Sequence, residues 1–283
     1  MEININDLPK YSNWPHRILG LSEFKKKKKT KSEILREFDI DKWGDLLKKI
    51  SSSNLQLSLK EVENLMYNES DHSICLINNR LVKMSPYDAF KEQYRITLET
   101  ISSFMPATSL CELGAGYGQI ILNLAKESIF ANTKIIAAEY TMSGVKLLQH
   151  ISESEKIDIV SGYCDLGSPK ITKINIPKNG IIFTSYAAHY INANNIKWVE
   201  AICLLNPSIV IHFEPIYQHY NKESLLGAMQ CRYMELNDYN CDLLLVLKHA
   251  ENNGLIEIVK ELPLVTASNP FMPISVIAWK PIL

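Results

Sequence analysis

The stretch that decides the fold spans residues 110–118 and reads Leu-Cys-Glu-Leu-Gly-Ala-Gly-Tyr-Gly. A short apolar run with one carboxylate leads into a glycine at every second position, which predicts a buried strand that ends in a tight turn. The residues from Gln119 to Ala125 then begin a helix. Glycines at such a junction let the backbone amides of a helix N-terminus approach a ligand, because no side chain blocks the way. We therefore expect a cofactor to bind where this strand ends.

A second carboxylate stands at the end of the next apolar run. Glu139 follows residues 134–138 and lies 21 residues past Gly118. In a βαβ unit an acid with this spacing sits at the tip of the second strand and binds ribose hydroxyls. The spacing predicts a cofactor that contains a ribose.

The glycine spacing argues against a dinucleotide. The pyrophosphate fingerprint has its third glycine three residues after the second, whereas Gly116 and Gly118 are two residues apart. Glu112 lies two residues before Gly114, where its charge would repel a pyrophosphate and attract a cationic amino group. A nicotinamide-dependent oxidoreductase is therefore the less favoured interpretation.

The pattern Glu-x-Gly-x-Gly-x-Gly, followed by an acidic strand end, resembles the class I S-adenosylmethionine-dependent methyltransferases. That cofactor has an ammonium group, no phosphate, and a ribose for Glu139 to hold. The resemblance covers about residues 107–283, and the alternative is a glycine-rich turn in another α/β protein. In the family, an acid and an apolar residue after the third strand hold the adenine, and Asp165 and Leu166 match them by order along the chain. The residues expected to bind the cofactor at the strand ends are Glu112, Gly114, Ala115, Gly116, Gly118, Glu139, Tyr140, Asp165, Leu166 and Thr184.

Composition describes an ordinary globular chain. It has 283 residues, of which 46% are hydrophobic and 22% charged, and its net charge of −1 provides no field to draw it onto nucleic acid or an anionic membrane. No apolar run approaches the roughly 20 residues that cross a bilayer, and residues 1–7 lack the features of a signal peptide. The six cysteines include no Cys-x-x-Cys pair, which suits reduced core thiols. We expect a cytoplasmic protein without nucleic-acid or membrane partners, and its oligomeric state is not predicted.

Two regions are expected along the chain. Residues 1–105 hold helical patterns and are predicted to form an N-terminal helical lid. Residues 106–283 alternate strand and helix, which predicts an α/β, Rossmann-like, doubly wound and mostly parallel seven-stranded sheet with an antiparallel C-terminal strand pair. One long helix is expected over residues 222–251. The predicted strands are 109–113, 134–139, 158–163, 180–184, 208–213, 255–264 and 274–279.

The clearest helix of the first region is expected over residues 86–105. Ser85 suits its N-cap and Pro86 its first position. Because this helix leads directly into the first strand, Tyr94 and Arg95 are expected to face the methionine end of the cofactor, with Arg95 on its carboxylate. The alternative is that Arg95 lies on the solvent side.

The run of five lysines at residues 25–29 is the most conspicuous charge feature. We expect a solvated helix flank or a mobile loop. A contact with phosphates or with an acidic substrate is the alternative.

Methyl transfer from a sulfonium requires an aligned acceptor and the removal of its proton. Candidates should follow the fourth and fifth strands, where open α/β sheets place their ligands. His189 would take the proton at neutral pH, although a structural histidine is an equal rival, while Tyr186 would close over the cofactor and Glu214 would contact the acceptor. A metal site from His212, Glu214 and His219 has no recognised ligand spacing, so no metal is expected.

The acceptor is the least determined part of the prediction. The tyrosines at positions 186, 190, 217, 220 and 233 suggest an aromatic wall with polar tips. Together with a weaker likeness of the C-terminal pattern to enzymes that tailor sugars, peptides or other natural products, this favours a small molecule or short peptide methylated on oxygen or nitrogen. The alternative is an S-adenosylmethionine-binding sensor or partner subunit without catalysis.

Overall fold

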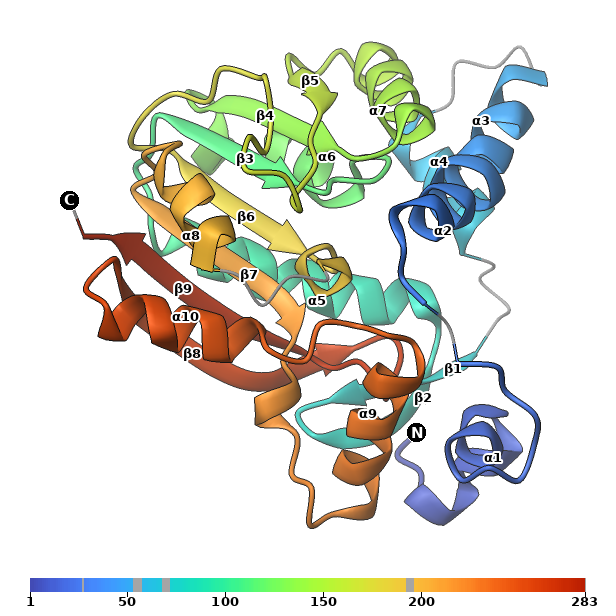
Figure 1. The fold of residues 1–283 in the computed structure, drawn as a ribbon. Helices are drawn as coiled ribbons and strands as arrows, with labels where there is room; N and C mark the ends of the chain where they lie inside the picture. The colour runs from blue at the N-terminus through green and yellow to red at the C-terminus, as the bar shows by residue number, and fades with distance from the viewer. Residues whose placement is uncertain (27, 53–57, 68–71, 192–195, 283) are drawn as a thin grey trace.

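The computed structural model describes residues 1–26, 28–52, 58–67, 72–191 and 196–282. Within these ranges one sheet of nine strands forms the centre of the molecule (Figure 1), in the order β2-β1-β8-β9-β7-β6-β3-β4-β5. None of the helices described there has both the length and the apolar character needed to cross a membrane.

Five neighbouring strands of the sheet are parallel, as the alternation of strand and helix predicts. Their carboxyl ends meet at one edge, which is where open α/β sheets bind ligands. These strands are β3 (Ser109–Leu113), β4 (Lys134–Glu139), β5 (Val160–Tyr163), β6 (Ile181–Ser185) and β7 (Ile209–Pro215).

The predicted C-terminal pair is also confirmed. Strands β8 (Ile256–Ala267) and β9 (Ile274–Pro281) are antiparallel, and β9 lies between β8 and β7. The connection between them is short, and a parallel return would require a crossover of a dozen or more residues.

The prediction of seven strands is wrong because the N-terminal region adds a hairpin. Strands β1 (Ser73–Ile77) and β2 (Arg80–Met84) pair with each other, and β1 joins the edge of β8. Asn78 and Asn79 form the turn with φ of 48° and 60°. Asparagine tolerates this left-handed backbone, and the resulting turn has the twist that closes a hairpin. The region before residue 105 is therefore not wholly helical.

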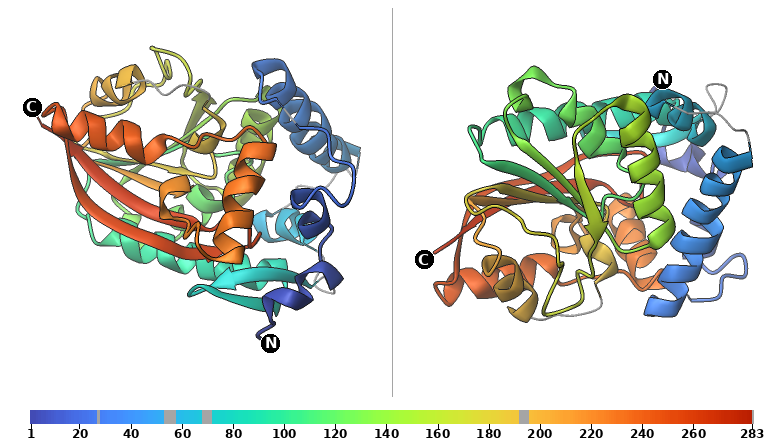
Figure 2. Two further views of the ribbon diagram at one scale, coloured as in Figure 1. Left: turned by 60° about the horizontal axis from the view of Figure 1, so that its bottom comes forward. Right: turned by 90° about the horizontal axis from the view of Figure 1, so that it is seen from above.

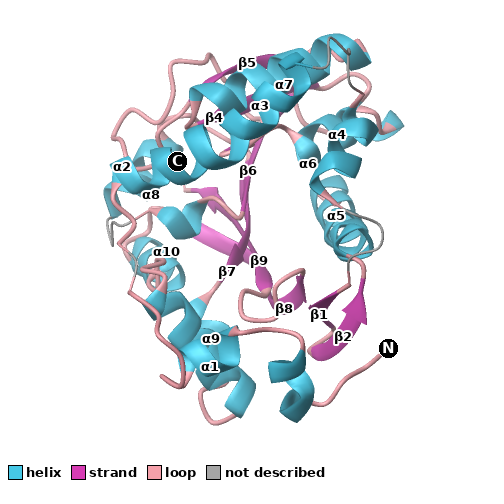
Figure 3. Cartoon of the chain, turned by 90° about the vertical axis from the view of Figure 1, so that its right-hand side faces the viewer, coloured by secondary structure: helices cyan, strands magenta, loops and turns pink. Residues whose placement is uncertain are grey.

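Helices cover both faces of the sheet (Figure 3). Two hydrophobic clusters on opposite faces hold them, because successive residues of each buried parallel strand point to alternate sides. The first face carries α5 (Pro86–Ser102), α6 (Gln119–Ala125) and α7 (Met142–Glu155), and the second carries α8 (Ile196–Cys203) and α10 (Leu243–Asn252).

The long helix expected over residues 222–251 is divided in two. Helix α9 (Leu225–Leu236) ends before a turn in which Asp238 has φ of 56°. The backbone N–H of Asn240 donates to the carbonyl oxygen of His189, so this turn is fixed to the loop after β6. Polar residues that favour turns interrupt the apolar pattern here.

The segment of residues 28–52, here called the covering segment, lies beyond the carboxyl ends of the parallel strands (Figure 1) and at the opposite end of the molecule from the C-terminus (Figure 2). The carboxylate of Asp39 accepts hydrogen bonds from the backbone N–H and the hydroxyl of Ser143, both at 2.7 Å, and so fixes the segment to the start of α7. Its elements are α2 (Lys31–Leu35), the π-helix η2 (Arg36–Lys42) and α3 (Trp43–Ser52).

The remaining N-terminal elements pack at either side of this segment. Trp14 contacts Tyr233 of α9, with 4.3 Å between the ring centroids. The backbone N–H of Leu59 donates to Glu155 at the end of α7. These elements are η1 (Ile5–Lys10), α1 (Trp14–Ile18) and α4 (Leu59–Met66).

Candidate functional site

A cavity of about 630 Å³ lies where the parallel strands end, beneath the covering segment. Its wall combines the glycine loop after β3, the ends of β4 and β5, the loop after β6, and side chains of the covering segment. This is the place that the sequence predicts for the cofactor.

The glycine loop turns sharply at the end of β3. The backbone N–H groups of Gly114 and Ala115 both donate to the carbonyl oxygen of Ala138, at 2.7 and 3.1 Å. Gly114 has φ of 80° and Gly116 has φ of 57°, in the left-handed region that favours glycine. The loop lines the cavity, while the backbone N–H groups of Gly114, Ala115 and Gly116 are bonded within the protein.

Glu139 is the most firmly held acid of the site. One carboxylate oxygen accepts from the backbone N–H of Gly116 at 2.9 Å, and the other accepts from the N–H and the hydroxyl of Thr141 at 3.0 and 2.6 Å. A carboxylate can accept about four hydrogen bonds, so capacity for a ligand hydroxyl remains. The acid is oriented before any ligand arrives.

Glu112 lies deeper, beneath the glycine loop. Its carboxylate accepts from the backbone N–H of Ile121 at 3.1 Å. Burial, together with the nearby charge of Glu139, raises the pKa of Glu112 well above its ordinary value. The neutral form is thereby favoured, which weakens the charge that the sequence analysis expected to attract an ammonium group.

Asp165 links the site to the covering segment. One of its oxygens accepts from the backbone N–H of Gly167 at 2.9 Å, and the other forms an ion pair with Lys31 at 2.6 Å. This hydrogen bond raises the pKa of the Lys31 ammonium. Leu166 and Tyr140 line the same part of the cavity.

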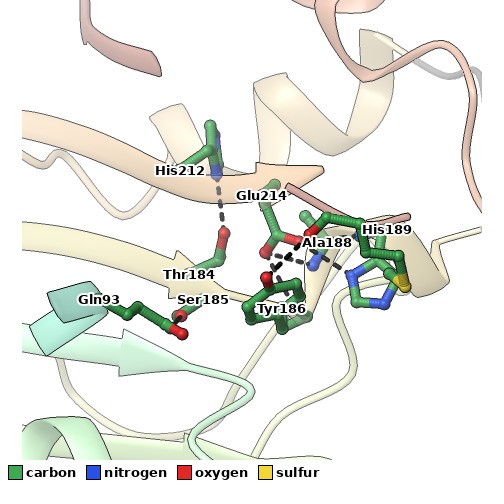
Figure 4. A network of polar contacts seen from close by, with 10 residues as sticks. Gln93, Thr184, Ser185, Tyr186, Ala188, His189, His212 and Glu214 are labelled. Carbon is green, nitrogen blue, oxygen red and sulfur yellow. Dashed lines mark hydrogen bonds and ion pairs between the residues drawn. The ribbon is translucent and has the colours of Figure 1, made fainter. Parts of the chain in front are cut away.

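The loop after β6 is organised around Glu214 (Figure 4). The carboxylate is fully buried and accepts from the backbone N–H groups of Ala187 and Ala188, both at 2.8 Å, and from Nδ1 of His189 at 3.0 Å. Burial alone would raise the pKa of Glu214, but the hydrogen bonds from His189 and the two amides outweigh it, so that the pKa is lowered. An ionised Glu214 requires Nδ1 of His189 to carry the proton, which leaves the lone pair on Nε2.

Only part of the predicted catalytic set reaches the cavity. His189 and Tyr186 line it, but Glu214 does not. The prediction that Glu214 contacts the acceptor is therefore wrong, because its oxygens are turned to the loop amides and to His189. The hydroxyl of Tyr186 donates to the carbonyl oxygen of Met272 at 2.9 Å, and burial raises its pKa, so it is no proton acceptor at neutral pH.

Thr184 and His212 lie below the cavity and do not line it. Nε2 of His212 accepts from the indole N–H of Trp279 at 3.0 Å, so Nδ1 carries the proton and donates to the hydroxyl of Thr184, also at 3.0 Å (Figure 4). Burial lowers the pKa of His212 to about 4. The predicted cofactor contact of Thr184 is wrong, since this hydroxyl serves the neutral histidine.

The predicted contacts of Tyr94 and Arg95 are also wrong. Arg95 forms ion pairs with Glu92 at 2.7 Å and Glu99 at 2.6 Å on the surface of α5, and the hydroxyl of Tyr94 donates to Glu127 at 2.9 Å. The helix turns another residue, Gln93, toward the cavity.

Gln93 donates from Nε2 to the hydroxyl of Ser185 at 3.0 Å, and both line the cavity (Figure 4).

Gly118 does not line the cavity and is required for packing, because a Cβ there would lie 2.2 Å from Cδ1 of Leu148. Its predicted approach to the cofactor is therefore also wrong.

The three residues weighed as metal ligands make separate contacts. His212 and Glu214 have the partners given above, and His219 contacts Ser275 at 2.8 Å and Glu261 at 2.9 Å. Among the residues that the structure describes, no group of three or more His, Cys, Asp or Glu side chains is arranged to hold a metal ion.

Comparison with known proteins identifies the architecture. No protein-family model and no curated protein matches the chain. Among solved structures, a geranyl diphosphate methyltransferase in complex with GPP and sinefungin superposes with a TM-score of 0.50 at 9% identity, over 68% of this chain and 78% of that one. The CcbJ methyltransferase of Streptomyces caelestis gives a TM-score of 0.50 at 9% identity, over 68% of this chain and 90% of that one.

This is the class I methyltransferase fold. S-adenosylmethionine is the cofactor of that fold. The cavity of this methyltransferase fold is lined by ten of the residues that the sequence predicts to bind the cofactor or to act in catalysis. They are Glu112, Gly114, Ala115, Gly116, Glu139, Tyr140, Asp165, Leu166, Tyr186 and His189.

Sequence reasoning missed the side chains that the covering segment adds to this methyltransferase fold. Helical periodicity predicts helices there but gives no sign that one face closes a cavity. Lys29, the last residue of the lysine run, is only 3% exposed, so the expectation of a solvated run is wrong at this position. The contributed residues are Lys29, Lys31, Ile34, Phe38, Lys42 and Trp43.

Proposed function

We propose that this protein is an S-adenosylmethionine-dependent methyltransferase that methylates oxygen or nitrogen of a small molecule or short peptide. One observation carries the proposal: the glycine loop, Glu139 and the oriented His189 share one cavity. The two halves are in contact, since a Cβ added to Gly114 would lie 2.4 Å from the Cβ of Ala187. A cofactor on the glycine loop is therefore next to the loop that holds His189.

The residues present fit the cofactor. Glu139 has a fixed carboxylate with acceptor capacity left for a ribose hydroxyl. Asp165 with Leu166 offers an acceptor and an apolar surface for the adenine. Gly114, Ala115 and Gly116 line the same cavity, so the methionine part of the cofactor can lie along this loop. When bound, the cofactor supplies an activated methyl group with a neutral leaving group.

The protein's own contribution to the reaction is the handling of a proton. Glu214 holds the proton of His189 on Nδ1, so Nε2 can accept the proton of an acceptor hydroxyl. A positive charge on the imidazole is then stabilised by the buried carboxylate. If the acceptor is a neutral amine, methyl transfer gives an ammonium ion, and His189 can accept a proton from it.

The alternatives explain less of the arrangement. A sensor or partner subunit that only binds the cofactor has no need for a buried carboxylate that fixes the tautomer of a histidine in the same cavity. A nicotinamide-dependent oxidoreductase is disfavoured by the glycine spacing, because Gly116 and Gly118 are two residues apart and the pyrophosphate fingerprint requires three. A nucleic-acid acceptor is not favoured, because the net charge of −1 includes no excess of basic residues.

Calorimetric titration with S-adenosylhomocysteine is the first test, and turnover of methyl-labelled S-adenosylmethionine in a metabolite extract is the second. We expect binding and a labelled product of low mass. Binding of NAD without any binding of S-adenosylhomocysteine would restore the oxidoreductase. Tight cofactor binding with no labelled product would favour the sensor, and a labelled nucleic acid or large protein as the sole product would contradict the acceptor class.

A further inference from the structure

We propose that the acceptor is an anion, whose carboxylate or phosphate group is bound beside His189 by the ammonium group of Lys29. The inference rests on the proposed function and names the substrate class of the same site.

Lys29 is held inside the protein, unlike its neighbours in the lysine run. Its backbone N–H donates to the carboxylate of Asp238 at 2.9 Å, and its ammonium group donates to Glu37 at 2.5 Å. Lys28 is exposed, whereas the side chain of Lys29 is only 2% accessible. Burying a cation costs free energy unless an opposite charge and hydrogen bonds compensate it, as Glu37 does here.

The ammonium group and the proposed base share the same two aromatic rings. Nζ of Lys29 lies 4.9 Å from the ring centroid of Tyr190 and 5.2 Å from that of Tyr239. The imidazole of His189 lies 4.2 Å from the ring of Tyr190 and 4.8 Å from that of Tyr239. All four side chains line the cavity. An acceptor within reach of His189 is therefore close to this cation.

The charges of the cavity wall are segregated. Among the residues described, the carboxylates that line it are Glu112, Glu139 and Asp165, all at the ends of strands that form the cofactor side. The part around His189, Tyr190 and Tyr239 has no lining carboxylate among the described residues. An anion bound there shares the ammonium group of Lys29 with Glu37, whose carboxylate does not line the cavity.

A cationic acceptor does not suit the same place. Tyrosine faces can bind an ammonium group, but here they already accommodate that of Lys29. Lys31 and Lys42 line the same cavity, and the bound cofactor adds a sulfonium. A second cation would be repelled, whereas an acceptor anion would be attracted by these charges.

The binding of matched probes tests the inference. Benzoate and phenyl phosphate are titrated calorimetrically into the complex with S-adenosylhomocysteine, with benzamide as the neutral control. We expect both anions to bind at least about tenfold more tightly than benzamide, and raised salt to weaken only the anions. Lys29→Met, which keeps the aliphatic stem, should abolish the preference, and Lys29→Arg should retain it. Lys28→Gln, an exposed neighbour, should bind the probes as the unaltered protein does.

Each contrary result has a distinct meaning. Equal affinity for benzoate and benzamide, or no binding of benzoate, overturns the inference, and so does a preference that survives in Lys29→Met. Loss of affinity for S-adenosylhomocysteine in that variant would assign Lys29 to the carboxylate of the cofactor instead. Should Lys29→Met fail to fold, the salt dependence of the unaltered protein decides. Failure of the unaltered protein to bind S-adenosylhomocysteine would contradict the proposed function, whereas the probes can still be titrated into the free protein.

Discussion

The indole ring of Trp43 lies directly against Gly116: a Cβ added to this glycine would be 3.0 Å from Cζ2 of the ring. A residue of the covering segment thus closes the cavity over the loop proposed to bind the cofactor. The ring also contacts Tyr117, with 5.4 Å between the centroids, so its environment depends on what occupies the loop.

Binding of S-adenosylhomocysteine should therefore change the fluorescence of Trp43. The chain has four tryptophans, and the other three, at positions 14, 198 and 279, do not line the cavity. We expect a saturable change in tryptophan emission on titration, and its loss in Trp43→Phe. An undiminished change in that variant would show that the ligand binds elsewhere.

Glu139→Ala should weaken binding of S-adenosylhomocysteine by more than tenfold. The ribose would lose a charged acceptor, which is worth on the order of 1.5–3 kcal/mol. Calorimetry measures the affinity, and a thermal melt accompanies it because Glu139 also holds Gly116 and Thr141. Glu153→Ala, an exposed position on α7, is the matched control. An affinity within threefold of the unaltered protein would exclude Glu139 from the cofactor site.

His189→Ala should lower kcat for the acceptor by roughly 10²-fold or more if the acceptor atom is oxygen. Its affinity for S-adenosylhomocysteine should change little. Glu214→Gln should also lower kcat, because a neutral amide no longer fixes the proton on Nδ1. Initial rates measured over a range of pH compare the two variants. A rate in His189→Ala equal to that of the unaltered protein would exclude His189 as the base.

His212 should make the fold less stable in mild acid. Its pKa is about 4 in the folded protein, below its ordinary value of 6.5, so between these values the unfolded chain binds a proton that the folded chain does not. Above pH 6.5 this histidine does not reduce the free energy of unfolding. As the pH falls from 6.5 toward 4, the free energy of unfolding declines. From pH 7 to pH 5 the loss is about 2 kcal/mol, measurable by urea unfolding. His212→Gln should show a weaker pH dependence, and an unchanged slope would contradict the assignment.

Gly118→Ala should destabilise the fold through packing. Gly118 has φ of 89°, and an added Cβ would lie 2.2 Å from Leu148. Gly254 also has positive φ, of 71°, but nothing lies within 4 Å of its added Cβ, so Gly254→Ala isolates the backbone strain. We expect Gly118→Ala to lose about 1–3 kcal/mol more than Gly254→Ala in urea unfolding. Equal losses would mean that Leu148 and α7 shift to accommodate the added methyl group without lowering the free energy of unfolding.

The sequence predicted the parts of the molecule whose structure depends on neighbours along the chain. Strands β3 and β4 and the antiparallel pair follow from apolar runs bounded by glycine, proline and polar residues. The hairpin at residues 73–84 was missed because its turn, Asn78-Asn79, has no glycine to mark it.

The site was predicted where one strand end supplies both a motif and its spacing, and missed where it depends on distant contacts. The burial of Lys29 depends on Asp238 and Tyr239, more than two hundred residues later in the chain. The outward position of Arg95 depends on which side of α5 meets the sheet, and a stripe of apolar residues leaves its flanks undetermined.

The π-helix η2 (Arg36–Lys42) gives the covering segment one further property. The backbone N–H of Trp43 donates to the carbonyl oxygen of Phe38, five residues earlier, where an α-helix would use the residue four before. In an α-helix each residue turns the chain by about 100°, so two residues five positions apart point about 140° away from each other. The π-turn has more residues per turn and brings residues five apart to the same side of the helix. Phe38 and Trp43 therefore both line the cavity, although they are five positions apart in one short segment.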